Sequence, residues 1–476
     1  MSLTRTLVVQ AENVAMSARG WSIIWPRGEF ARLVLLAVAV RLLLVPLTHT
    51  WDGQTWANVF AELSQDPNPL EAIRRPYETM RELSLLTAAA GRHSDFYEYW
   101  AYPPLQLYIY WPLAHLYTFM GGAVQPSFAV QPAMIAPSLP MPLLALIHAP
   151  SIAADVVVLF IMRALGVGLA RLRWYAFNPL VLLVGVWTFD AVMVAFLLFA
   201  LYWAEQRRPL RASAALGLGA ATKFVALAAL PAVLLGILDD DRRPIGRRIL
   251  QVVMAMLTCG AVVALVTAPV ADGVAYVIQF QLQRFGAGLS LPQLLTTWSS
   301  PTPVGDWLPS LEAYASVEMG GLLLPLALLT ACLVIVHWRL PLSSAFLILV
   351  LAFLAGAKIV NEPYALSALA LATVELERRP SWGMQLGLHL LWVVPFAYAL
   401  LNTPAWAFGL SALQQVFPTV RPSLDVWLGA YRTFRGWQDA RLPYVVLAVV
   451  FQAGILGAAW SVVRGASRAI DVTTNA

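Results

Sequence analysis

The stretch "LLAVAVRLLLVPLTHTWDGQTWANVF" (residues 35–60) decides the fold that we expect, because an apolar run passes directly into a polar segment that contains two tryptophans. The run begins near Phe30 and has the roughly 20 residues that a membrane-spanning helix needs. Arg41 interrupts it, and a charged side chain inside a span is costly unless it faces a partner or a wet cavity. We therefore predict an uncleaved first span, followed by Asp52 at the membrane surface.

The rest of the chain is equally apolar. Of its 476 residues, 59% are hydrophobic and 12% are charged, whereas about 25% of the residues in a soluble domain are charged. The net charge of +5 falls mostly in short loops, where it sets the orientation of spans, and no basic stripe points to nucleic acid. Cys259 and Cys332 lie in apolar runs, as buried free thiols do. The composition predicts an all-α, multi-pass membrane protein that contacts the lipid bilayer and binds no nucleic acid.

Apolar segments of two lengths follow one another along the chain. Those of spanning length lie at about 30–49, 103–121, 143–162, 249–270, 319–337, 342–360, 384–402 and 443–463. Shorter ones lie at about 175–188, 189–204, 212–222, 224–238 and 363–376. A helix of about 14 residues reaches only about 21 Å, so the shorter segments need protein around them or border a cavity. We expect a transmembrane helical bundle of about 11–14 spans.

Arginine and lysine predict the orientation of the bundle, because cytoplasmic loops carry an excess of both. Basic residues cluster at 205–211, 239–248, 337–340, 377–380 and 464–468, all of which we place in the cytoplasm. The opposite face then receives 50–102, 271–318, 358–362 and 403–441. The region 122–174 does not fit this count. "RLR" (171–173) favours the cytoplasm, whereas the number of preceding spans gives the other face, and the Pro-rich segment 124–142 is either an extra crossing or a re-entrant loop.

The order of segments predicts four parts. They are a cytoplasmic N-terminal segment (1–29), a transmembrane catalytic module (30–376), C-terminal transmembrane helices (377–463, with the outer loop 403–441) and a cytoplasmic tail (464–476). The first outer loop, 50–102, is long and polar, and 68–91 reads as one or two amphipathic helices on the membrane surface.

Several ionisable residues are candidates for chemistry in or near this loop. Asp52 at the outer mouth is either a functional acid or an ordinary helix N-cap, and Arg41 is either turned to a cavity or snorkels to the interface. "HSDFYEYWAYPPL" (93–105) combines Asp95 and Glu98 with aromatic rings and Tyr102. Aromatic faces and carboxylates suit a sugar, although aromatic residues also form ordinary interfacial belts.

Further candidates lie in later segments. Asp155, Asp190 and Lys223 fall within apolar runs, where ionisable groups are functional candidates by default, and structural pairing of an Asp with a Lys or Arg is the competing account. Arg284 and Lys358 lie on the predicted outer face and suit a phosphate. No nucleotide-binding motif is present, so we expect the donor to be a lipid phosphate.

The order of these motifs resembles that of the GT-C superfamily, the polytopic glycosyltransferases that use polyprenyl-phosphate sugars. The similarity is strongest to the mannosyltransferase branch that includes the first GPI mannosyltransferase and prokaryotic relatives. It rests on Arg41 followed by Asp52, on "YEYWAYPPL", "HAPSIAADVVV", "FNPLVLLVGVWTFDAVMVAFLLFALYW", "GAATKFVALAALPAVLL", "FQLQRFGAGLSL" and "KIVNEPYALSALAL". These stretches cover most of residues 30–376.

The resemblance implies an inverting hexosyl transfer, with mannose as the sugar that the branch suggests. Asp52 would be the general base, and Arg284, Lys358 and Lys223 would bind the phosphate, ahead of Arg74 and Arg75. Asp95, Glu98, Tyr102, Arg41, Asp155 and Asp190 would contact donor or acceptor. Many relatives carry Asp-x-Asp in the first loop, whereas this chain has Asp52-Gly53-Gln54, so the sequence requires no metal cofactor although a divalent ion is not excluded.

Two other classes of protein stay open. A membrane transporter would use Asp155, Asp190 and Lys223 as a substrate pathway, but we find no internal repeat of the kind that transporters show. A non-catalytic subunit of a glycosylation complex would explain the missing second acid. The acceptor can be a lipid, a glycan or a protein, and the carrier dolichol or undecaprenol. The expected location is a prokaryotic plasma membrane, or the endoplasmic reticulum in a eukaryote.

Overall fold

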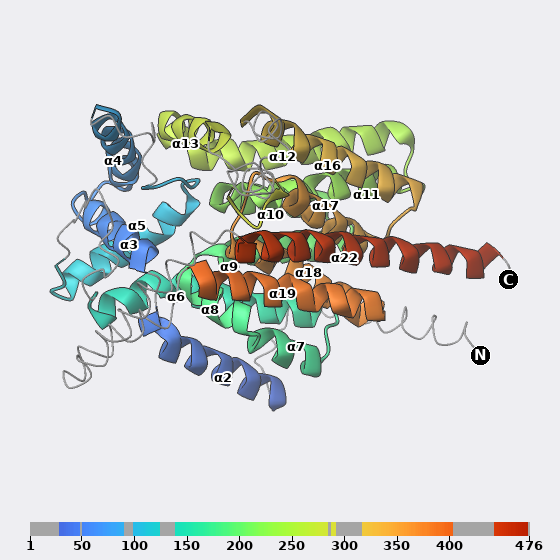
Figure 1. Cartoon of the computed structure of the whole chain (residues 1–476). Helices are drawn as coiled ribbons and strands as arrows, with labels where there is room; N and C mark the ends of the chain where they lie inside the picture. The colour runs from blue at the N-terminus through green and yellow to red at the C-terminus, as the bar shows by residue number, and fades with distance from the viewer. Residues whose placement is uncertain are drawn as a thin grey trace, which may run out of the picture.

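The protein is an all-α bundle, as the sequence predicts (Figure 1). The computed structural model describes residues 28–47, 50–89, 99–123, 139–283, 287–291, 317–402 and 442–474. Strands in these residues are limited to one short parallel pair, β1 (Ala287–Gly288) and β2 (Ile359–Val360).

Most helices run between two ends of the bundle. These are α2 (Glu29–Leu44), α6 (Met141–Ala164), α8 (Pro179–Trp187), α9 (Asp190–Glu205), α10 (Pro209–Thr222), α11 (Leu230–Leu238), α12 (Ile245–Thr267), α16 (Val317–His337), α17 (Leu342–Gly356), α18 (Ala365–Arg378), α19 (Trp382–Asn402) and α22 (Leu442–Thr474). The helices at the two ends are α3 (Thr50–Leu63), α4 (Pro69–Ala89), α5 (Leu105–Phe119), α7 (Leu169–Ala176) and α13 (Ala271–Gln283). Short 3₁₀ helices are η1 (Val45–Leu47), η2 (Phe224–Ala229), η3 (Ala268–Val270) and η5 (Glu362–Tyr364).

Four helices in the described residues are long and apolar enough to cross a membrane, and α8 with α9 make a fifth if that bent pair counts as one span. They are Met141–Ala164, Ile245–Leu282, Trp382–Leu401 and Pro443–Gly465. This number is lower than the 11–14 spans that we expected, because many of the predicted segments form helices shorter than a bilayer. Three of the shorter apolar helices are Phe224–Leu238, Gly321–His337 and Leu342–Gly356.

Burial inside the bundle explains three of the short helices. Helices α9, α17 and α18 are buried along almost their whole length, and their side chains belong to one hydrophobic core that also includes residues of α6, α19 and α22. A helix surrounded by protein does not have to match the thickness of the lipid. Interior helices can therefore be shorter than the outer ones that enclose them.

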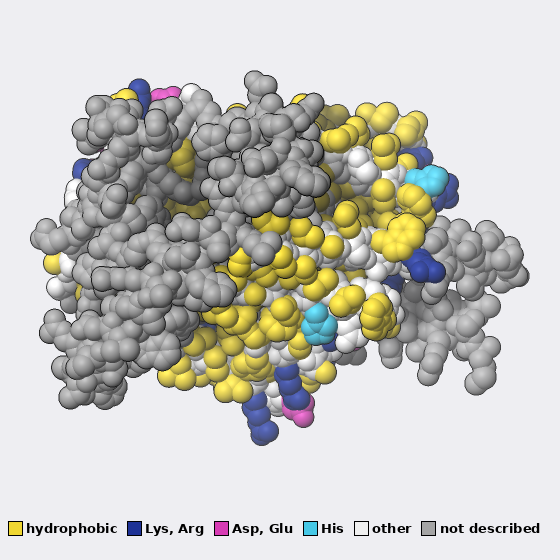
Figure 2. All heavy atoms as spheres, in the orientation of Figure 1, with side chains coloured by type: hydrophobic (Ala, Val, Ile, Leu, Met, Phe, Trp, Pro, Cys, Tyr) yellow, Lys and Arg dark blue, Asp and Glu magenta, His cyan; other side chains and the backbone are white. Residues whose placement is uncertain are grey.

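The outer surface of the bundle is strongly apolar. Figure 2 shows hydrophobic side chains covering the face formed by α19 and α22, with charged side chains toward its edges. Exposed leucines continue around α2, α12 and α16, among them Leu43 at 77%, Leu265 at 79% and Leu322 at 69% exposure. Soluble monomers rarely expose so much contiguous apolar surface. The protein is therefore membrane-embedded, and its long apolar helices agree with a multi-pass arrangement.

The basic loops gather at one end of the bundle, which we call the basic end. The guanidinium of Arg378 pairs with Glu205 and donates to the carbonyl of Leu165 at 3.0 Å. Arg171 pairs with Glu377 at 2.6 Å, and Arg173 with Glu29 at 3.0 Å. These contacts hold 171–173 at the same end as 29 and 377–378, so this stretch lies with the other basic loops.

The segment predicted as the second span, 103–121, forms a helix of 15 residues, which is shorter than a span needs. Its residues form α5, which lies with α3 and α4 beyond one end of the long helices (Figure 1). The Tyr108 hydroxyl donates to the carbonyl of Val266, at the end of α12, and the Trp111 indole to that of Asp66, after α3. These tyrosine and tryptophan contacts tie α5 to the end of α12 and to the segment after α3.

Candidate functional site

The end of the bundle opposite the basic end, which we call the loop end, holds a cluster of aromatic rings. The Trp56 ring on α3 lies 5.4 Å from that of Trp100, 5.1 Å from Tyr110 and 5.2 Å from Phe189. Trp56, Phe60 and Leu63 recur at helical spacing, and all are buried. This apolar face of α3 turns the helix toward α5 and toward the start of α9.

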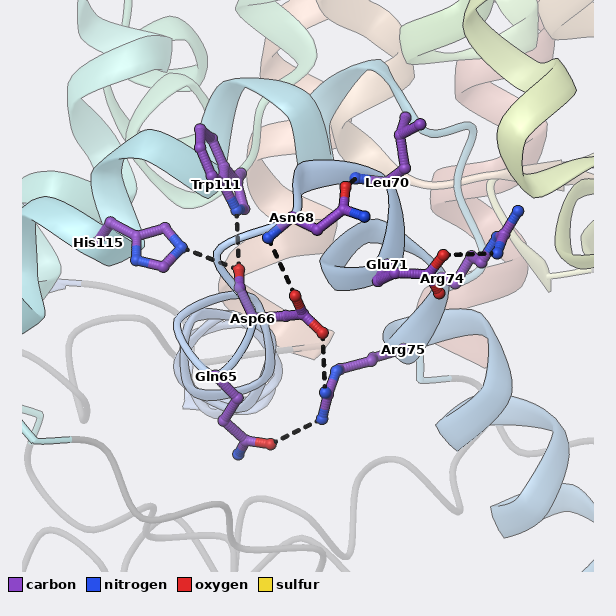
Figure 3. A network of polar contacts seen from close by, with 9 residues as sticks. All are labelled: Gln65, Asp66, Asn68, Leu70, Glu71, Arg74, Arg75, Trp111 and His115. Atoms are coloured by element: carbon purple, nitrogen blue, oxygen red, sulfur yellow. Dashed lines mark hydrogen bonds and ion pairs between the residues drawn. The ribbon is translucent and has the colours of Figure 1, made fainter.

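Polar contacts around Asp66 tie α3, α4 and α5 into one layer (Figure 3). Its carboxylate accepts from the backbone N–H of Asn68 and from Arg75 at 3.1 Å. Its backbone carbonyl accepts from Trp111 at 3.2 Å and lies 3.1 Å from the imidazole of His115. The Asn68 N–H and Arg75 hold the pKa of Asp66 below its usual value. The predicted amphipathic helix at 68–91 is confirmed as α4, with Arg74 and Arg75 engaged on its exposed side.

Lys223 and Asp190 form a buried ion pair where this layer meets the bundle. The Lys223 ammonium lies 2.7 Å from Asp190 Oδ1, and the side chains are 8% and 1% exposed. Extended backbone at Lys223 separates α10 from η2, and Asp190 is the first residue of α9. The start of α9 and the end of α10 thus meet through opposite charges. This is the structural pairing of an Asp with a Lys that the sequence analysis gave as the competing account.

Aromatic rings surround the Lys223 ammonium. It lies 4.2 Å from the ring centroid of Tyr364, 5.7 Å from Tyr102 and 5.9 Å from Phe189. Cations are attracted to aromatic faces at such distances, more strongly when water is excluded. Tyr102 was predicted to line a site, whereas nothing in the local sequence of Phe189 or Tyr364 connects either ring to Lys223.

Polar atoms without a protein partner occur close to this pair. Among the described residues, Asp190 Oδ2 and the indole nitrogen of Trp56 are buried and have no hydrogen-bond partner. Most buried polar atoms in proteins are hydrogen-bonded to protein or to water. The Trp56 and Phe189 rings lie 5.2 Å apart, and Phe189 immediately precedes Asp190, so these two atoms share one neighbourhood. The loop end therefore offers a carboxylate oxygen and one N–H donor to a polar group.

The two segments predicted to supply further cations lie side by side. Strand β1 pairs with β2 in parallel, with Ala287 opposite Ile359 and Gly288 opposite Val360. The Lys358 ammonium donates to the carbonyl of Leu282 at 2.6 Å, and partial burial lowers the pKa of Lys358. Gly288 has a φ of +71°, which glycine adopts readily. Arg284 lies outside the described residues.

Arg41 and Asp155 form a second buried ion pair deeper in the bundle. Arg41 Nε lies 2.8 Å from Asp155 Oδ2, and the side chains are 1% and 2% exposed. Arg41 also donates to the carbonyl of Ala37 at 3.1 Å. A Cβ atom at Gly185 of α8 would lie 2.8 Å from Asp155 Oδ2, so α8 closes over the pair. Both residues were predicted to contact donor or acceptor, and that role stays a prediction.

The side chains of three predicted acids lie outside the described residues. Asp52 lies in the first turn of α3, but its side chain is outside the described part of the chain. Asp95 and Glu98 lie in 90–98, which is also outside it. In the described ranges, no three His, Cys, Asp or Glu side chains are grouped so that they could hold a metal ion. Cys259 and Cys332 are free thiols.

Glu62 is a buried acid that the sequence analysis missed. It is 6% exposed and accepts from the Thr79 hydroxyl at 2.6 Å. Burial raises the pKa of its carboxyl from 4.5 to about 7, against the opposing effects of the Thr79 and Tyr99 hydrogen bonds and the charge of Arg75. The signal was its spacing, since Glu62 lies between Phe60 and Leu63 on the buried side of α3.

Because of Glu62, we expect the stability of the folded protein to depend on pH. Because its pKa is higher in the folded protein than in the unfolded chain, its contribution is complete below pH 4.5 and is lost as pH rises toward 7. The loss amounts to about 3 kcal/mol for a shift of this size. Glu62→Gln, which keeps an acceptor for Thr79, should therefore raise the melting temperature in detergent at pH 8 and leave it unchanged at pH 4.5. The exposed Glu78→Gln serves as the control, and an equal response of both variants would contradict the assignment.

Comparison with known proteins adds no assignment. No family model matches the chain, and no curated protein was found to match it.

Proposed function

We propose that the protein is a membrane glycosyltransferase that moves a hexose from a polyprenyl-phosphate donor to an acceptor hydroxyl at the loop end. In this proposal Asp52 is the general base. The donor phosphate binds near Lys223, Lys358 and Arg284. The resemblance to the GT-C superfamily suggests mannose, and the basic loops suggest that the loop end faces away from the cytoplasm.

The contact between Trp56 and Phe189 is the observation that carries the proposal. Trp56 follows Asp52 by one helical turn, so the two positions share a face of α3. Phe189 immediately precedes Asp190, whose carboxylate pairs with Lys223. The 5.2 Å between the two rings therefore relates the position of Asp52 to that of a buried cation far along the chain, which supports a shared site.

The proposed reaction forms one bond and breaks one. The acceptor oxygen attacks C1 of the donor sugar from the side opposite the phosphate, and Asp52 takes the hydroxyl proton. The bond between C1 and the phosphate oxygen breaks, and the polyprenyl phosphate leaves with increased negative charge. Cations that are already positioned stabilise this charge without reorganising. Lys223 is buried and Lys358 is partly buried, and the low local dielectric would strengthen their interaction with a phosphate.

A transfer assay tests the proposal. Purified protein in proteoliposomes receives a radiolabelled polyprenyl-phosphate hexose, mannose first, together with a membrane extract as the source of acceptors. We expect the radiolabelled hexose to appear in a product that separates from the polyprenyl-phosphate donor. Label that crosses the vesicle membrane unchanged would identify a transporter instead. The two buried ion pairs favour this second candidate, because ionisable groups at depth also form substrate pathways.

Arg284→Glu should weaken donor binding in the same assay. A charge-assisted hydrogen bond contributes about 1.5–3 kcal/mol, so the expected rise in the donor KM is roughly 10-fold to 100-fold. Arg81→Glu is the matched control, because Arg81 is an exposed residue of α4 in the layer of α3, α4 and α5 and is not a phosphate candidate. An unchanged KM in Arg284→Glu would remove this residue from the phosphate site.

A further inference from the structure

A cavity of about 1060 Å³ opens at the basic end, far from the site described above. The ends of α9, α11 and α16 and the starts of α12 and α17 line it. Its floor is apolar and includes Ala232, Val233, Ile335, Leu342 and Ala345. No part of the proposed transfer reaction uses this cavity.

Charged residues of both signs form its rim. The acids are Glu205, Asp239, Asp240 and Asp241, and the arginines are Arg207, Arg242, Arg243 and Arg339. Three of the acids already have partners, since Glu205 pairs with Arg378, Asp240 with Arg243 and Asp241 with Arg248. Within the described residues, Arg207, Arg242 and Arg339 form no ion pair, and Asp239 is the remaining acid. The rim therefore has an excess of unpaired positive charge.

Two of these arginines occupy positions where glycine is the usual residue. Arg207 has a φ of 57° and Arg339 a φ of 44°, and no other residue apart from glycine has a positive φ in the described ranges. Each follows the end of its helix and closes it, with the N–H of Arg208 bonded to Trp203 and that of Leu340 to Ile335. Such helix ends most often carry glycine, because a side chain is sterically disfavoured there.

Two other helices of the same protein end in the usual way. Gly121 after α5 has a φ of 83°, and Gly166 after α6 a φ of 93°. Attraction between arginine and a helix C-terminus, or a preference for cytoplasmic arginine, is satisfied by any position in the last turn. Neither of these two preferences explains why the arginine stands at the position of the helix end where φ is positive. Both Arg207 and Arg339 do so, and both line the same cavity. Residues kept in disfavoured backbone conformations cluster at binding sites.

We infer that this cavity binds the phosphate of an anionic phospholipid. Arg207, Arg242 and Arg339 hold the headgroup phosphate, and the acyl chains leave along the apolar surface beside the cavity. That surface includes Leu238, Leu333 and Val336, which are 39%, 62% and 58% exposed. Basic pockets between spanning helices on the cytoplasmic side bind such headgroups. The adjoining apolar surface favours a lipid over a soluble phosphate.

Thermal unfolding in detergent tests this inference without an activity assay. Vesicle-derived phosphatidylglycerol should raise the melting temperature of the wild-type protein, and phosphatidylcholine should not. In Arg207→Gly/Arg339→Gly we expect an equal or higher melting temperature without lipid, because glycine relieves the backbone. The concentration of phosphatidylglycerol that gives half of the shift should rise at least tenfold, as expected for the loss of two basic side chains at an anionic headgroup.

A charge-matched control uses arginines of the same end that do not line the cavity. Arg211→Gln/Arg247→Gln should respond to phosphatidylglycerol like the wild-type protein, whereas Arg207→Gln/Arg339→Gln should not. An unchanged lipid response in the two cavity variants would overturn the inference. Equal protection of the wild-type protein by inorganic phosphate would overturn the assignment to a lipid.

Discussion

Asp52→Asn is expected to lower the rate of sugar transfer by about 10²–10⁴-fold, the contribution that a general base typically makes. Asparagine has nearly the same size but cannot take the proton of the acceptor hydroxyl. The measurement is the initial rate with saturating labelled donor in proteoliposomes. Because the binding of donor phosphate uses other residues, the donor KM should change little while turnover falls.

The control for this prediction is Asp272→Asn. Asp272 is an exposed acid in the first turn of α13, at the same end of the bundle as Asp52. Its replacement should leave turnover at the wild-type level, and both variants should melt at the wild-type temperature. Near-normal turnover in Asp52→Asn would remove this residue from the role of base while leaving the proposed class of reaction open.

The second large effect is expected at the ion pair between Arg41 and Asp155. Asp155→Leu leaves the Arg41 guanidinium buried without its partner, which typically costs about 3–5 kcal/mol. The double variant Arg41→Met/Asp155→Leu removes both charges and should recover most of that loss, because well-packed apolar replacements of a buried pair are often neutral. Thermal unfolding followed by tryptophan fluorescence in detergent measures both.

An exposed pair gives the comparison. Arg74 and Glu71 are 45% and 51% exposed, and an exposed pair contributes at most about 1 kcal/mol, so Glu71→Gln should shift the melting temperature little. Equal losses in Asp155→Leu and in the double variant would mean that packing, and not charge, sets the cost. If the double variant also keeps its transferase activity, Arg41 and Asp155 are structural residues and do not contact the substrate.

Local sequence was enough to predict where the helices lie. The apolar run at 143–162 became Met141–Ala164, and the run at 384–402 became Trp382–Asn402. The basic loops predicted to share a face are joined by contacts such as that of Arg378 with Glu205. Helix formation and the preference of arginine for one face depend on composition within one segment or loop, so a single sequence reveals them.

The sequence by itself determined an apolar, all-α chain with charged ends, and only the tertiary structure decided which of its rare charges meet. Arg41 and Asp155 are 114 residues apart in the chain, and Lys223 and Asp190 are 33 apart. The same is true of α5, whose tyrosine and tryptophan contacts join it to Val266 and Asp66 from other segments. Pairing depends on how all the helices pack at once, because burying a charge is tolerated only where a partner from another segment reaches it.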